Sequence, residues 1–231
     1  MLVILATRQD ETAAWLADRW QPHDAILLTA ADLSASGWSF YLPSSGKSRA
    51  CIGGRKILNQ EIDGVLTRIQ RVHGQELNHI VPSDRQYVAS EMTAFLLAWL
   101  SSLTCPVLNR PTSNCLSGPG WRTEEWIRLA SRLGIAVSAV RRRSSDSVND
   151  PEDQPSCEVV VAGDECFGKA APVLLENART LARAAGTDFL AVRFSGPEAD
   201  RAFVSANLWP DPTSPEIAAA VLRRLQGRSA C

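Results

Sequence analysis

The sequence predicts a mixed α/β fold, because short apolar runs alternate with segments of helical periodicity along most of the chain. This alternation indicates a largely parallel sheet in the first half. In the second half, two strand-like runs at 189–194 and 202–207 are joined by a short turn and indicate an antiparallel part. With 231 residues, 45% of them hydrophobic, the chain can bury a sizeable core.

The expected strands are short apolar runs bounded by turn residues, and the expected helices carry apolar residues at three- and four-residue spacing. The strands cover 2–6, 25–28, 40–42, 62–69, 106–111, 135–140, 159–162, 189–194 and 202–207. The helices cover 11–19, 84–103, 124–133, 174–185 and 215–225. Between 141 and 155 the periodicity stops, and serines, aspartates and prolines follow three arginines. This segment predicts a flexible, exposed loop.

The composition excludes several classes of partner. The formal net charge of −1 gives no reason to expect nucleic acid or an anionic membrane. No apolar run reaches the length of a transmembrane helix, and the first residues predict a strand and not a signal peptide. The six cysteines form no C-x-x-C pair and lie apart from the three histidines, so we expect no zinc site. Scattered cysteines without a signal peptide favour the cytoplasm.

Three segments, in this order, are similar to segments of the ATP-grasp superfamily, above all its RimK-like branch of ligases that modify ribosomal peptides or protein C-termini. The first comprises 63–68, Arg85-Gln86-Tyr87 and Glu91; the second comprises 107–111 and 124–137; the third comprises 159–164, 188–194 and 203–210. The resemblance implies a Rossmann-like (pre-ATP-grasp) N-terminal domain, residues 1–110, and a reduced ATP-grasp part, residues 111–231. It also implies a truncated chain, because the family's lid domain would have to fit into 141–155, which is too short for a folded domain.

The chain departs from the family at the positions that hold magnesium and ATP. Where the resemblance implies a phosphate-binding lysine stands Thr123; an aspartate ligand falls on Arg193 and a glutamate ligand on Ser205. Asn207 alone keeps the family's residue. Magnesium needs anionic oxygen ligands, and exchanging Asp for Arg beside a divalent ion disfavours the ion by on the order of 10 kcal/mol at an effective dielectric of 20. We therefore expect no metal, no nucleotide cofactor and no catalytic residue.

A candidate ligand or partner cleft remains, built mostly from arginines. In the first half it comprises Arg68, Arg71, Arg85, Asn109 and Arg110. Arginines at the carboxyl edge of an α/β sheet fit an anion or carboxylate site. The alternative to an anion site is that these arginines are solvated or form an ion pair with Glu91 or Asp84. For Asn109 the alternative is a turn in which its side chain bonds to its own backbone.

The second half contributes Arg122, Arg193, Asn207 and Trp209 to this candidate cleft. Trp209, followed by a proline, is expected to be exposed and to anchor an interface, because tryptophan is enriched at binding hot spots. Arg193 should reach solvent or pair with an acidic group, since an unpaired buried charge is unfavourable by several kcal/mol. Trp99 and Trp126, on apolar helix faces, are expected in the core.

These observations favour a non-catalytic ATP-grasp homologue, a pseudoenzyme that serves as a binding or scaffold subunit for a partner enzyme or a peptide substrate. Its surface would support a homodimer or a complex with a protein or peptide. The alternative is an enzyme: a carboxylate–amine ligase, or a small-molecule-binding enzyme, whose repurposed cleft binds an anion through Arg68, Arg122 and Arg193.

Overall fold

A computed structural model describes residues 1–42, 47–138 and 156–227, so the predicted loop at 141–155 lies outside the described residues. The fold is mixed α/β, as predicted. The chain forms two compact units: Met1–Gly120 together with the stretch from Asp211 onward, and Trp121–Pro210. The domain boundary expected from the sequence lay after residue 110, whereas the first unit continues to Gly120 and also includes the stretch from Asp211 onward. Leu116 belongs to the first unit because it is part of that unit's core and its amide donates to the carbonyl of Gln70 at 2.9 Å.

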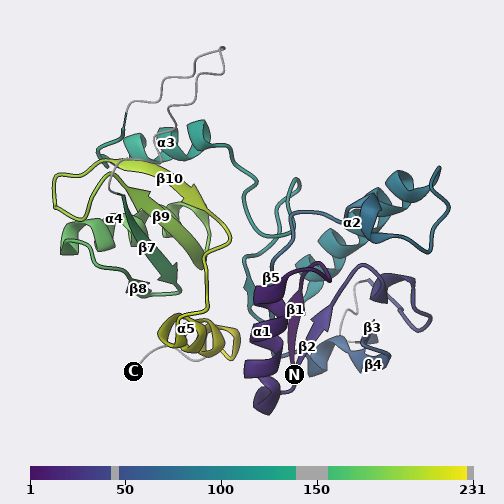
Figure 1. Ribbon diagram of the computed structural model, residues 1–231. Coiled ribbons are helices and arrows are strands. Elements are labelled where there is room, and N and C mark those ends of the chain that lie inside the picture. The colour runs from purple at the N-terminus through teal and green to yellow at the C-terminus, as the bar shows by residue number, and fades with distance from the viewer. Residues whose placement is uncertain (43–46, 139–155, 228–231) are drawn as a thin grey trace. The chain divides into compact units, whose positions relative to one another are not determined.

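The first unit is built on a parallel sheet with the strand order β2-β1-β5-β6 (Figure 1). Each strand falls inside a predicted apolar run, because both faces of a parallel sheet are covered and the strands are apolar throughout. The strands are β1 (Leu2–Leu5), β2 (Ala25–Leu28), β5 (Gly64–Thr67) and β6 (Val107–Leu108).

Helices bury both faces of this sheet. Val3 and Val65 point to one face, where they join a core with Trp99 and Leu100 of α2. On the other face α1 contacts β2 and α5 contacts β5, the latter so closely that Gly64 has no room for a side chain against Leu225. The helices are α1 (Glu11–Arg19), α2 (Arg85–Ser102) and α5 (Pro215–Leu225), with 3₁₀ turns at Gln21–His23, Asp32–Ser34, Asn59–Glu61 and Gly74–Glu76.

A two-stranded hairpin, β3 (Arg49–Ile52) and β4 (Arg55–Leu58), also belongs to the first unit. Neither strand was among those predicted, although Gly53-Gly54 between them is a turn signal. The strand predicted at 40–42 is wrong: only Ser39 bridges to Arg49, and Leu42 is 73% exposed. The apolar character of that segment serves packing instead, because Phe40 contacts Phe95 edge-to-face.

The second unit contains an antiparallel sheet with the order β10-β9-β7-β8. The helices α3 and α4 pack on one face of it, and the core there includes Trp126, Leu181 and Phe194. Trp99 and Trp126 are both buried, as predicted. The elements are α3 (Thr123–Arg132), β7 (Cys157–Ala162), β8 (Glu165–Phe167), α4 (Pro172–Ala185), β9 (Phe189–Phe194) and β10 (Phe203–Asn207).

Two strand predictions in this unit need correction. The segment predicted as a strand at 135–140 forms a single parallel bridge, between Val137 and Phe203, in the part that the structure describes. The short strand β8 was not predicted, since its three residues carry a glutamate and follow directly on the Gly163-Asp164 turn. In neither unit does a described helix have the length and apolar character needed to cross a membrane.

Candidate functional site

The carboxyl edge of the parallel sheet is where the fold favours ligand binding. The chain leaves β1 toward β2 on one side and later adds β5 on the other, so the point where the order reverses lies between the ends of β1 and β5. Arg68 follows β5 at this point, and its amide donates to the carbonyl of Leu5 at 2.7 Å. Next to it, the hydroxyl of Thr67 donates to the carbonyl of Leu108 at 2.9 Å, which ties β5 to β6.

An ion pair occupies this point. The Nε of Arg68 lies 2.8 Å from Oδ2 of Asp10, and the two side chains are 11% and 16% exposed. The other carboxylate oxygen of Asp10 accepts the amide of Ala13 at 2.9 Å and caps α1. Arg68 is therefore paired, but with Asp10 and not with Glu91 or Asp84. Its Nη1 is buried and has no hydrogen-bond partner among the described residues.

The other candidates of the first unit have separate surroundings. Asn109 is buried at the end of β6, beside Arg68 at the sheet edge, and the hydroxyl of Thr67 donates to its carbonyl at 3.2 Å. The guanidinium of Arg110 turns back to the carbonyls of the loop before β6, and that of Arg85 donates to the carbonyls of the loop before α2. Arg71 is exposed. Only Arg68 and Asn109 of these five thus meet at the sheet edge.

A small cavity of about 280 Å³ lies at the ends of β1 and β2. Its residues were not predicted as a site, because they come from three separate loops. It contains both charges and hydrogen-bonding groups, and its His79 Nε2 lies 2.7 Å from the Ser34 hydroxyl. The lining residues are Arg8, Gln9, Thr29, Ala30, Ala31, Gln75, Glu76, Asn78 and His79.

In the second unit, Arg193 stands in a row of three residues across neighbouring strands. It is opposite Glu158 of β7 on one side and Ser205 of β10 on the other. The Nη2 of Arg193 and Oε2 of Glu158 are 4.0 Å apart, and the side chains are 44% and 47% exposed. The prediction that Arg193 reaches solvent or pairs with an acid is confirmed on both counts, with the acid in the same chain. We call Glu158, Arg193 and Ser205 the cross-strand row.

The remaining candidates lie around this sheet. Asn207 follows Ser205 by two positions and bonds locally: its Oδ1 accepts the amide of Trp209 at 3.0 Å. Trp209 is 36% exposed, which confirms that it reaches the surface. Arg122 is exposed at the start of α3, where its amide donates to Glu125 at 2.9 Å. Thr123 is the first residue of that helix.

Candidate metal ligands are sparse in the part of the chain that the structure describes: no group of three His, Cys, Asp or Glu side chains gathers there. In the cross-strand row Glu158 is the single carboxylate, and it faces a guanidinium. Burial raises the pKa of the thiols of Cys105, Cys115 and Cys166, so these cysteines are protonated at neutral pH.

The comparisons with known proteins identify the fold. No family model matches the chain, and no curated protein matches its sequence. Among solved structures, the macrocyclase MdnC bound with its precursor peptide MdnA, from Microcystis aeruginosa, has a TM-score of 0.67 at 12% identity over 98% of this chain and 100% of that one. A RiPP-associated ATP-grasp ligase from Chryseobacterium gregarium, in complex with ADP and a leader and core peptide, has a TM-score of 0.67 at 11% identity over 99% and 97%.

The chain therefore has an ATP-grasp-like fold. More particularly, it is similar in fold to the macrocyclase MdnB of Microcystis aeruginosa, with a TM-score of 0.64 at 13% identity over 97% of this chain and 98% of that chain. A RimK domain protein from Sphaerobacter thermophilus matches at 0.50. These matches extend over nearly the whole of both chains, so the likeness is not confined to one unit.

A second cavity, of about 610 Å³, lies on the β3–β4 hairpin. Its residues were not predicted as a site either, although the sequence contains a signal. Lys47 and Arg49 stand two positions apart, and Lys56 follows just after the Gly53-Gly54 turn, which is the spacing of side chains on one face of a hairpin.

Proposed function

We propose that this protein is a non-catalytic, peptide-binding member of the ATP-grasp fold that serves as a binding or scaffold subunit, and that it does not use magnesium and ATP. The cross-strand row carries the proposal. The resemblance puts the family's aspartate and glutamate metal ligands at Arg193 and Ser205, which are direct partners in the register of β9 and β10. A guanidinium in the middle of that row repels the cation that two carboxylates would attract.

The peptide part of the proposal is supported by what the related folds bind. MdnC was crystallised with its precursor peptide, and the Chryseobacterium gregarium ligase with a leader and a core peptide. A chain of the same fold without metal chemistry can still bind such a peptide and present it to a partner enzyme. We further propose that it acts as a homodimer or within a complex, with Trp209 at the contact, and in the cytoplasm, where its five described cysteines stay unpaired.

Calorimetric titration with magnesium and ATP tests the proposal. We expect no heat of binding and no release of ADP, alone or with a precursor-type peptide present. A solved ATP-grasp ligase titrated in the same buffer serves as the positive control. Magnesium-dependent binding of ATP at millimolar concentration would refute the non-catalytic function.

A second candidate function is a carboxylate–amine ligase with a repurposed anion cleft. Two observations favour it: the matches to ATP-grasp ligases extend over nearly the whole of both chains, and Arg68 has a buried nitrogen without a partner among the described residues. Such an enzyme would bind the carboxylate of a substrate through Arg68, Arg122 and Arg193. It would release ADP or AMP on mixing with ATP and peptide, whereas the scaffold would not.

A further inference from the structure

The β3–β4 hairpin has two faces of different chemistry. Side chains alternate between the faces of a strand, so Ala50, Ile52 and Ile57 share one face. All three are buried and belong to the core of the first unit. In the segment beside β3, Ser39 bridges to Arg49, and the preceding residue, Trp38, faces the core. Its ring packs edge-to-face on Trp99, with ring centroids 5.6 Å apart. This inner face accounts for the stability of the hairpin.

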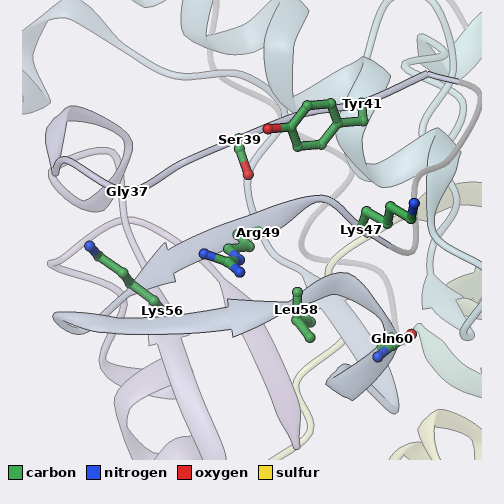
Figure 2. A pocket seen from close by; sticks show the side chains of 8 residues that line it. All are labelled: Gly37, Ser39, Tyr41, Lys47, Arg49, Lys56, Leu58 and Gln60. Carbon is green, nitrogen blue, oxygen red and sulfur yellow. The ribbon is translucent and has the colours of Figure 1, made fainter.

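The outer face lines the cavity of about 610 Å³. Ser39 bridges to Arg49, and Arg49 in turn pairs with Leu58 of β4, so these three positions form one row across the face. The residues two positions before and after them also line the cavity, except Cys51, which is buried. Together the lining residues are Gly37, Ser39, Tyr41, Lys47, Arg49, Lys56, Leu58 and Gln60 (Figure 2).

Three of these residues are cations, Lys47, Arg49 and Lys56, and none is an acid. Within the described part of the chain, no ion pair is formed by any of the three. The acid that follows Gln60 in the chain, Glu61, uses its carboxylate to accept the amide of Leu58 at 2.6 Å. A charge of +3 thus faces solvent on a protein whose net charge is −1.

Gly37 shapes one end of this face. A Cβ atom built on it would lie 2.8 Å from Cε and 3.3 Å from Cδ of Lys56. The φ angle of Gly37 is +125°, a backbone conformation that a side chain rarely permits. The aliphatic part of Lys56 therefore lies across the glycine, and this leaves its ammonium at the edge of the cavity.

The three cations occupy successive positions along the hairpin, with Lys56 on the neighbouring strand β4. Arg49 is two positions after Lys47, and Lys56 is paired with Cys51, two positions after Arg49. Figure 2 shows Lys47, Arg49 and Lys56 in this order across the pocket. Two residues of a strand span about 6.6 Å, which is also the distance between alternate side chains of an extended peptide. Phosphates joined by a single bridging oxygen lie much closer together than this step.

We propose that the outer face of the β3–β4 hairpin binds an extended peptide segment that carries acidic residues at alternate positions, with one carboxylate for each of Lys47, Arg49 and Lys56. This deepens the proposed function and rests on it, since it names the chemistry of the peptide partner. The apolar edges of Tyr41 and Leu58 would contact the aliphatic parts of that segment.

Fluorescence anisotropy with labelled synthetic peptides tests the site on the full chain. The probe alternates glutamate with threonine. A second peptide has the same composition with its glutamates in one block, and inorganic triphosphate is a competitor. Arg49→Gln should weaken binding of the alternating peptide about fivefold, and Lys47→Gln, Arg49→Gln and Lys56→Gln together about a hundredfold. Arg49→Lys should keep most of the affinity, and raised salt should lower it.

The matched control is Arg19→Gln on α1, which removes one exposed cation that does not line the cavity and should leave binding unchanged. Circular dichroism checks that each variant is folded. Equal affinity for the alternating and the block peptide, or equal loss with Arg19→Gln, would overturn the inference. Displacement by triphosphate at lower concentration than by the peptide would overturn it in favour of a compact polyanion. Magnesium–ATP binding would overturn the proposed function alone, because the peptide titration judges this site separately.

Discussion

Restoring carboxylates in the cross-strand row should create a divalent-cation site. Arg193→Asp with Ser205→Glu would line up three carboxylates across β7, β9 and β10, since Glu158 is already there. A unit charge and a divalent ion 4 Å apart interact by about 2 kcal/mol in water and about 8 kcal/mol at a dielectric of 20. Arg193 and Glu158 are 44% and 47% exposed, so the lower value applies. Replacing the repulsive Arg193 by an attractive aspartate then favours binding of the divalent ion by about 4 kcal/mol, or about a thousandfold in affinity.

Thermal unfolding with and without magnesium or manganese measures this gain. Without metal the double variant should unfold at a lower temperature than the wild type, because the Arg193–Glu158 attraction is lost and like charges adjoin. Saturating metal, at a hundred times the dissociation constant, should return about 2.7 kcal/mol. The uncharged pair Arg193→Gln with Ser205→Gln is the control. A metal-dependent shift of the wild type equal to that of the double variant would refute the reasoning.

Three further predictions concern packing, assembly and the thiols. Gly64→Ala should lower the free energy of unfolding, measured by urea denaturation, by about 2 kcal/mol, because its Cβ would meet the carbonyl of Leu225. The control is Gly74→Ala, whose Cβ would have its nearest neighbour at 3.4 Å and which should change the free energy of unfolding by less than about 1 kcal/mol. Trp209→Ala should weaken self-association or a complex by about 2 kcal/mol, measured by light scattering, and a strictly monomeric wild type would contradict this. Burial raises the pKa of the Cys115 thiol, so less of the reactive thiolate is present at pH 7. Alkylation of Cys115 should therefore be slow in the folded protein and fast once urea unfolds the chain. Fast labelling of the folded protein would contradict the burial of this thiol.

The elements that the sequence predicted best are those whose pattern is local and strong. The bounds of α1, α5, β2 and β9 agree with the prediction to the residue, because apolar periodicity and the turn residues around it coincide there. Strands β3, β4 and β8 were missed, since runs of three or four residues that include a charge carry little periodicity. The cationic face of the hairpin was missed as well, because Lys56 joins Lys47 and Arg49 on one face only through the pairing of β3 with β4.

The candidate site was harder to predict than the fold. Arg68 was expected at the sheet edge and lies there, but its partner Asp10 is 58 residues away in sequence and reaches it only through the register of β1 and β5. Arg85 and Arg110 bind backbone carbonyls of nearby loops, and nothing in the residue types distinguishes such an arginine from one that awaits a ligand. The surroundings of Arg193 were predictable, because an arginine within a strand has to reach solvent or pair with an acidic group.

The position of α5 in the first unit has a consequence for biosynthesis. The chain completes the second unit at Pro210, before it supplies the helix that covers β5 beside Gly64. A domain emerging from the ribosome generally folds as a unit once its residues are available. The second unit can thus fold while the first unit still has an open apolar face. A stop codon between Asp211 and Leu225 would leave that face permanently uncovered, and such a product would be a target for chaperones and proteases even though every residue of the second unit is present.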